Sequence, residues 1–285
     1  MAVTNSLTAR NQRVGITTYL NSEKVLGNIE QALGKVNKQR FITSIISATN
    51  NNPALQECSN ASILSAALLG ESLNLSPSPQ LGHYYMVPFD DKNKGKVAQF
   101  QLGYKGYIQM AIRSGQYRKL NVLAIKEGEL IRFDPMNEEI EVKLIEDEEA
   151  RENAPTIGYY AMFELINGFR KALYWSKPKM EAHALKYSPG YKGDKKKGTA
   201  WTFWSKDFDG MAYKTMLRQL ISKWGIMSID MVTALDSDMA VINEDGSRNY
   251  VEPAEDIIDM EPIQEEKTES SDNNTGAAAA LFGGK

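Results

Sequence analysis

The feature that most constrains the fold of this chain is a series of short apolar runs in its middle. Residues 156–166 and 169–176 are two apolar, aromatic-rich runs, and Asn167-Gly168 lies between them. Because Asn and Gly both accept a positive φ, this pair between two such runs is a strong signal for a tight β-hairpin turn. Strand-like runs also occur at residues 83–89, 97–102, 117–126, 130–133 and 140–145, with a polar loop at 90–96. We therefore expect antiparallel hairpins in the middle of the chain.

Apolar residues with helical spacing lie on both sides of this β-rich stretch. The first pattern follows Ser22, a possible cap, and continues to Val36. Further helices are expected from Phe41 to a stop at residues 50–53, from a cap at Ser59 or Asn60 to Leu73, and at residues 104–113, 179–187 and 201–224, with 188–200 as a flexible loop rich in Gly and Lys. Helices packed around a small antiparallel sheet define the α+β fold class.

The C-terminal part of the chain differs in charge from the rest. Residues 236–285 include 13 acidic and three basic residues, a net charge of −10, whereas the remainder has 30 basic and 23 acidic residues, a net charge of +7. Beyond residue 243 the sequence has few large apolar side chains, which is typical of disorder. We expect a core at residues 1–242 and a flexible acidic tail at residues 243–285. A basic body suits a polyanionic ligand, although a solvated surface with a solubilising tail has the same composition.

The compartment is indicated by features that the sequence lacks. Cys58 is the lone cysteine, and disulfides need pairs and an oxidising compartment. No apolar run approaches the roughly 18 residues that span a bilayer, and the first 18 residues lack the apolar core of a signal peptide. We therefore expect a cytoplasmic protein without membrane contact.

The motifs of common enzymes and cofactor sites are missing. Neither His83 nor His183 has the spacing of a zinc-binding motif. Gly193 and Gly198 have the spacing of a phosphate-binding loop, but Thr199 stands where that loop requires lysine. We expect no ATP, no metal, no other cofactor and no enzymatic activity.

One alternative enzyme class stays open at this point. Asp134, followed by Glu141 and Lys143, has the spacing of metal-dependent nucleases, in which two carboxylates hold Mg²⁺ and the lysine stabilises charge at the phosphate. The same residues also fit the solvent-facing side of an antiparallel strand, because apolar residues alternate with them.

Basic and aromatic residues interleave in several places, as in proteins that bind single-stranded nucleic acid. A Gly-Tyr-Lys-Gly tetrad at residues 103–106 recurs at residues 190–193. Glycine permits close approach to phosphate, lysine supplies the counter-charge, and tyrosine can stack or donate a hydrogen bond. The second tetrad continues into a lysine run at residues 195–197 and then Trp201 and Trp204.

The expected helix at residues 201–224 adds a further basic feature. Lys206, Lys214 and Arg218 fall within about 120° of the helix at 100° per residue. Such a face would follow a sugar–phosphate backbone without reading bases. The separation is incomplete, since Leu217 and Ile221 lie in the same arc, and a solvated helix face is the alternative. The candidate DNA-binding residues are Lys105, Tyr107, Arg113, Lys192, Lys195, Lys196, Trp201, Lys206, Lys214 and Arg218.

Several of these segments resemble the RecT family of phage and prophage single-strand annealing proteins. The resemblance spans about residues 25–231 and is carried by LGHYYMVPF at 81–89, LGYKGYI at 102–108, RSG at 113–115, Trp201 with Trp204, MAYKT at 211–215 and Arg218. It implies a recombination protein that coats single-stranded DNA as rings or helical filaments and pairs it with a complementary strand without nucleotide. The family is similar in core architecture to the lambda Red beta protein and to the eukaryotic Rad-type annealing domain.

The resemblance also implies partners and roles. Such proteins act in the bacterial host with a phage exonuclease and with the host single-strand-binding protein, and the acidic tail is outside the resemblance. Carried over by position, Lys105, Lys214 and Arg218 would contact phosphate, and Trp201 and Tyr107 would shape or stack in the groove. Two alternatives stay open: a Mg²⁺-dependent nuclease, and a module that coats single-stranded DNA passively.

Overall fold

The computed structural model describes residues 14–91 and 94–250. Its helices are α1 (Ile16–Leu20), α2 (Glu23–Asn51), α3 (Asn60–Ser72), α4 (Tyr104–Ser114), α5 (Glu148–Asn153), α6 (Lys177–Tyr187), α7 (Pro189–Lys197), α8 (Phe203–Lys206), α9 (Phe208–Trp224) and α10 (Ile229–Ser237), with a 3₁₀ helix at Pro53–Glu57. Its strands are β1 (Tyr84–Asp91), β2 (Gly95–Leu102), β3 (Tyr117–Lys126), β4 (Leu130–Asp134), β5 (Glu139–Val142), β6 (Thr156–Leu165), β7 (Arg170–Ser176), β8 (Ala240–Ile242) and β9 (Arg248–Tyr250). The predicted α+β class is confirmed, because small antiparallel sheets pack against helices.

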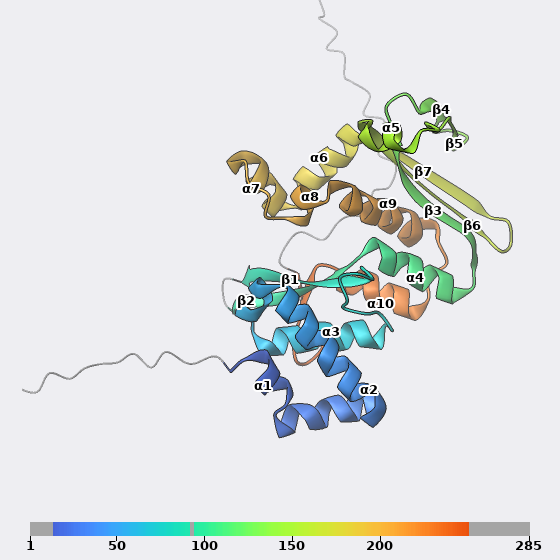
Figure 1. The fold of residues 1–285 in the computed structure, drawn as a ribbon. Coiled ribbons are helices and arrows are strands. Elements are labelled where there is room, and N and C mark those ends of the chain that lie inside the picture. Colours follow the sequence, from blue (N-terminus) through green and yellow to red (C-terminus); the bar gives the residue numbers. More distant parts are fainter. Residues whose placement is uncertain (1–13, 92–93, 251–285) are drawn as a thin grey trace, which may run out of the picture.

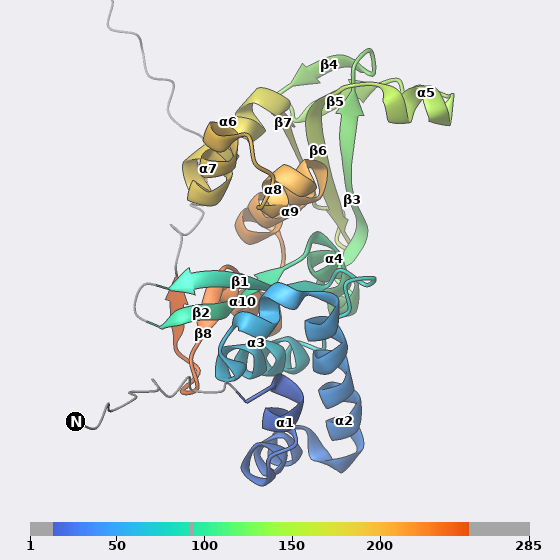
Figure 2. The same ribbon diagram turned by 60° about the vertical axis from the view of Figure 1, so that its left-hand side comes forward.

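The first sheet has the order β1-β2-β8-β9, and α3 covers one of its faces. Tyr84, Phe100 and Leu102 point to that face and join a core that extends to α1, α2, α4 and α10. The opposite face carries Tyr85 and Gln101, which lie across from each other in the register. In Figures 1 and 2 this sheet and its helices form the lower half of the molecule.

The second sheet has the order β3-β6-β7 and is covered on both faces. Tyr159, Phe163 and Trp175 pack against α6 and α9 on one face. Tyr160 and Met162 pack on the other face, together with apolar residues of the β4–β5 hairpin. The two halves meet where α4 contacts α9, with the rings of Tyr104 and Tyr213 5.7 Å apart (Figure 1).

The predicted hairpins are confirmed. β6 and β7 pair around Asn167-Gly168, where Gly168 has a φ of 87°, and β1 pairs with β2 from Tyr84↔Leu102 to Asp91↔Gly95. The helix expected at residues 104–113 is α4, which ends at Gly115 in the left-handed conformation. These elements follow from local turn and cap chemistry, so the sequence alone is enough to locate them.

Three helix predictions need correction. Residues 201–224 form two helices, because Asp207 leaves the helical conformation and its carboxylate accepts the Gly210 N–H at 2.9 Å to begin α9. Residues 188–200 contain α7 where a flexible loop was expected. The predicted apolar stripe up to Val36 breaks at Gly34, whose φ is 75°, and Val36 is 91% exposed.

The expected domain boundary lies inside the β8–β9 hairpin. Ala240 pairs with Phe100 of β2 and with Tyr250 of β9, so the first sheet extends past residue 243. That the annealing core ends at residue 242 stays a prediction. The predicted disordered tail lies, from residue 251 onward, outside the described residues.

Candidate nucleic-acid interface

Helix α7 carries the lysine run. It begins at Ser188, whose hydroxyl accepts the Tyr191 N–H, has Pro189 in its first turn, and ends at Gly198 with a φ of 67°. These cap residues explain why the segment is helical despite its glycines. Lys192 and the lysines at residues 195–197 are exposed, and Lys195 Nζ lies 2.7 Å from Glu181 Oε1.

Exposed aromatic side chains follow these lysines, in the loop after α7 and in the short helix α8. Trp201 is 79% exposed and Phe203 is 38% exposed. The Phe203 ring lies 5.5 Å from the ring of Tyr85, which projects from the face of the first sheet opposite α3. Lys206, at the end of α8, is also exposed. Residues 189–206, which we call the α7–α8 segment, therefore contain five lysines and one acidic residue, and they contact β1 through an aromatic pair.

Lys105 lies near the same aromatic pair, in the first turn of α4. A Cβ built on Gly82 would lie 3.0 Å from the Tyr85 hydroxyl and 3.3 Å from Lys105 Cδ, so both side chains pass close to this glycine. Lys105 itself is exposed. The structure thus brings together Lys105 and the α7–α8 segment, which are nearly one hundred residues apart in sequence.

The glycines of the first tetrad have a different role from the predicted one. A Cβ on Gly103 would lie 2.2 Å from the carbonyl oxygen of Gly82, and one on Gly106 would lie 2.2 Å from that of His83. These glycines therefore allow α4 to pack against the chain before β1, and close approach to phosphate is not needed to explain them.

Two further candidates are engaged within the protein. The Tyr107 side chain is fully buried in the first core, which is incompatible with the predicted stacking on DNA. Arg113 donates hydrogen bonds to the carbonyls of Leu73 at 2.7 Å and Asn74 at 3.2 Å, and so holds the turn after α3.

Lys214 and Arg218 do not lie on an exposed helix face. Their side chains on α9 are 5% and 12% exposed, and both point to Asp238, whose side chain is completely buried. Lys214 Nζ lies 2.9 Å from one carboxylate oxygen and Arg218 Nη1 lies 3.0 Å from the other. The Leu102 N–H also donates to Asp238 at 2.8 Å. The predicted basic face on this helix is therefore wrong for these two residues, because a buried carboxylate binds them, and this geometry does not favour the implied contact of either with DNA.

His83 lies beside the same region of α4. Its Nδ1 accepts the Ser76 N–H at 3.3 Å. Burial lowers the pKa of His83, and the positive charges of Arg113 and Lys105 lower it further. The neutral form is therefore favoured in the folded protein.

The residues of the nuclease alternative lie in the β4–β5 hairpin and directly after it. The Asp134 carboxylate accepts the Met136 N–H at 2.9 Å and the Asn137 side chain at 2.9 Å, and the hydrogen bond from that side chain is the largest cause of its lowered pKa. Glu141 lies across from Arg132 in the β4–β5 register. Within the described ranges, no three acidic, His or Cys side chains are grouped so as to hold a metal. The contacts of Asp134 favour the strand interpretation.

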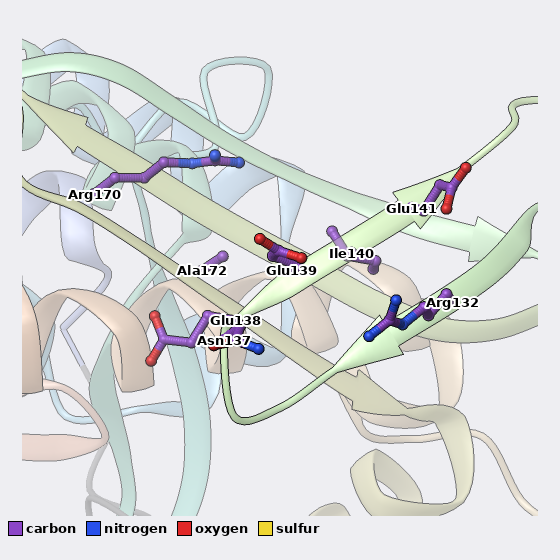
Figure 3. A pocket seen from close by; sticks show the side chains of 8 residues that line it. All are labelled: Arg132, Asn137, Glu138, Glu139, Ile140, Glu141, Arg170 and Ala172. Carbon is purple, nitrogen blue, oxygen red and sulfur yellow. The ribbon is translucent and has the colours of Figure 1, made fainter.

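A pocket of about 420 Å³ adjoins the same hairpin. Figure 3 shows Arg132 and Arg170 around it, together with the carboxylates of Glu138, Glu139 and Glu141. Because negative and positive groups share its walls, the pocket offers no field that would attract a phosphate backbone.

Sequence reasoning missed Tyr85, Phe203 and Asp238. Phe203 could have been found from its place between Trp201 and Lys206. Asp238 gave no local signal, because its partners lie 20 and 24 residues earlier in the chain. In the part of the chain that the structure describes, every helix is too short or too polar to cross a bilayer.

Comparison with known proteins supplies the family. The model of the RecT family matches residues 39–256. "Uncharacterized protein YqaK" of Bacillus subtilis (strain 168) is 42% identical over 255 residues, which is 88% of this chain and 81% of that protein. "Protein RecT" of Escherichia coli (strain K12) is 28% identical over 227 residues, which is 78% of this chain and 80% of that protein. The chain therefore belongs to the RecT family, and membership of this family implies single-strand annealing in recombination.

Proposed function

We propose that this protein binds single-stranded DNA along the α7–α8 segment and anneals it to a complementary strand without ATP. The observation that carries the proposal is the joint exposure of four lysines on α7 and the rings of Trp201 and Phe203 beside them. Lys105 and Tyr85 complete the surface from the first half of the molecule. Lysines that follow a backbone and aromatic rings that stack on bases are the two elements of sequence-independent single-strand binding.

This arrangement suits annealing. Annealing needs strands that are held by their backbones with the base edges free, so the affinity must come from cations, backbone amides and stacking rather than from base-edge hydrogen bonds. Base pairing then supplies about 1.4 kcal/mol per step, which makes a nucleotide unnecessary. We therefore expect slight sequence preference, no metal requirement and no covalent chemistry.

Assembly and partners are part of the proposal. We expect a homo-oligomer, as a ring or a helical filament, on single-stranded DNA and on the annealed duplex. We also expect a phage exonuclease that produces the single strand, the single-strand-binding protein of the bacterial host as a second partner, and action in the cytoplasm of that host. The acidic residues from 243 onward would contact a partner.

Annealing of two dye-labelled complementary oligonucleotides in EDTA, without nucleotide, tests the proposal. The protein should accelerate duplex formation above the spontaneous rate, leave both strands intact, and have no effect on strands that are not complementary. Binding without acceleration would support the passive coating module. Degradation of the strands with Mg²⁺, abolished by Glu141→Gln, would support the nuclease.

Truncation tests the tail. The cut is best placed after Tyr250, because Arg248–Tyr250 pairs with β8. The shortened protein should anneal bare DNA almost as well as the full chain and fail on DNA that is coated with the host single-strand-binding protein. Tighter binding to bare DNA, strongest at low salt, would indicate instead that the tail competes with DNA.

A further inference from the structure

Asp194 is a buried acidic residue within the exposed lysine run of α7. It is 5% exposed, and five donors from residues 199–205 converge on its carboxylate. Thr199 Oγ1 donates to Oδ1 at 2.6 Å. Oδ2 accepts the N–H groups of Trp201 at 3.0 Å and Thr202 at 2.8 Å, and the hydroxyls of Thr202 at 2.9 Å and Ser205 at 2.7 Å.

These contacts determine the shape of the loop between α7 and α8. One carboxylate binds the first residue after Gly198, the backbone at two successive positions, and the short helix α8. The hydrogen bond from Thr199 is the largest cause of a pKa of Asp194 far below its usual value. The carboxylate is therefore ionised at neutral pH, and ionised acceptors make stronger hydrogen bonds than neutral ones.

The loop combines a fixed backbone with an exposed ring. The N–H of Trp201 is bound to Asp194, yet the Trp201 side chain is 79% exposed. Trp204, three residues later, is 3% exposed, and its ring lies 5.1 Å from the ring of Phe208. Trp204 therefore supplies the buried aromatic side chain that packs this segment against the core. Core packing thus does not account for Trp201. A large exposed ring on a fixed backbone is suited to a ligand, because little backbone entropy remains to be lost on binding.

We propose that Asp194 is a positioning residue that holds Trp201 ready to stack on an unpaired nucleobase. The proposal rests on the single-stranded DNA binding proposed above. Asp194 acts through the loop and does not touch the DNA. Its hydrogen bonds come from amides and hydroxyls, so its charge is satisfied without the α7 lysines, and these remain at the surface beside the ring.

Two ligands separate stacking from backbone binding. Oligo(dT) offers phosphates and bases, whereas an abasic oligonucleotide of the same length offers phosphates alone. The wild-type protein should prefer oligo(dT). Trp201→Ala and Asp194→Ala should each reduce this preference by roughly tenfold, since stacking on one base contributes about 1–3 kcal/mol. The slope of log affinity against log salt should stay as in the wild type, because the lysines are retained.

Asp194→Asn is the matched control. Asparagine keeps an oxygen for the donors of residues 201–205, and its amide can donate to the Thr199 hydroxyl, so the preference for oligo(dT) should be largely retained. Adding Asp194→Ala to Trp201→Ala should cause no further loss of the preference for oligo(dT). If Asp194→Ala fails to fold, Thr202→Val, which removes one hydroxyl donor, should show a smaller loss of the same preference.

The outcomes distinguish this proposal from the one on which it rests. If the wild type binds neither oligonucleotide, the proposed function itself is contradicted. If it binds both equally, or if Asp194→Ala retains the preference of the wild type, DNA binding stands and the positioning role is overturned. Equal loss of affinity for both oligonucleotides in Asp194→Ala would assign a merely structural role to Asp194, as would failure of Asp194→Asn to restore the preference in a folded protein.

Discussion

The α7–α8 segment and helix α9 both combine lysine or arginine with aromatic and apolar residues. In each of them, side chains or backbone groups donate hydrogen bonds to one buried aspartate, Asp194 in the first and Asp238 in the second. Asp238 accepts hydrogen bonds from Lys214 and Arg218, and so removes two of the three cations of α9 from the surface. Asp194 accepts from amides and hydroxyls, which leaves the α7 lysines exposed. Whether a basic segment can bind a polyanion therefore depends on which groups donate hydrogen bonds to the buried aspartate. The number of lysines and arginines in the segment does not decide it.

The largest effect should come from Asp238→Ala. This substitution leaves two cations inside the protein without their carboxylate, and breaking a buried ion pair in this way typically costs about 3–5 kcal/mol of folding free energy. Urea denaturation followed by circular dichroism measures the loss. The control is Asp236→Ala, an exposed neighbour that should change stability by no more than about 0.5 kcal/mol. Equal stability of the two variants would mean that Asp238 does not hold α9 to the first sheet.

An intermediate effect is expected from the exposed aromatic ring of Phe203 in the α7–α8 segment. Phe203→Ala removes the ring that pairs with Tyr85 and should weaken binding to oligo(dT) by about 1–3 kcal/mol if this ring stacks on a base. Phe169→Ala is a suitable control, because Phe169 is 44% exposed and lies at the β6–β7 turn, away from the α7–α8 segment (Figure 1). Fluorescence anisotropy measures both. The same loss in both variants would indicate that exposed rings bind DNA irrespective of position.

The smallest effect should be a pH dependence of stability from His83, whose pKa is lowered mainly by burial and further by the charges of Arg113 and Lys105. Because the pKa of His83 is lowered in the folded protein, the unfolded chain binds more protons between the two pKa values. The contribution of His83 to stability is therefore complete above the unfolded value of about 6.5 and is lost as pH falls from there toward the folded value. Urea denaturation between pH 7.5 and 5.5 should show a decline that His83→Asn flattens. A decline that is unchanged in this variant would assign the pH dependence to other groups.

The sequence was sufficient where structure depends on near neighbours. Asn167-Gly168 and Gly115 predicted a hairpin and a helix end correctly, because turn and cap chemistry acts over a few residues. The lysine run at residues 195–197 was also recognised as a candidate surface. Helix α7 itself was missed, although Ser188 and Gly198 carry its cap signals, because its glycines and lysines suggested a loop.

The sequence was insufficient where a residue that is distant in the chain decides whether a side chain is exposed. Lys214 and Arg218 look like a surface pair on a helix, and only the position of Asp238 in the folded chain shows that they are bound internally. Tyr107 follows the same rule: it lies in a basic and aromatic motif, but the packing of α4 places its ring in the core. Burial of a single side chain depends on contacts that no short motif encodes.

The most direct test of this account is the salt dependence of single-stranded DNA binding in two variants. One replaces three exposed lysines of α7, as Lys192→Gln, Lys196→Gln and Lys197→Gln together; the other is Lys214→Met, at a temperature where circular dichroism shows it folded. Each lost phosphate contact lowers the log–log slope by about 0.7 for single strands. We predict a slope smaller by about 2 for the α7 variant and an unchanged slope for Lys214→Met. A reduced slope for Lys214→Met, with the α7 variant equal to the wild type, would contradict the account and move the DNA to α9.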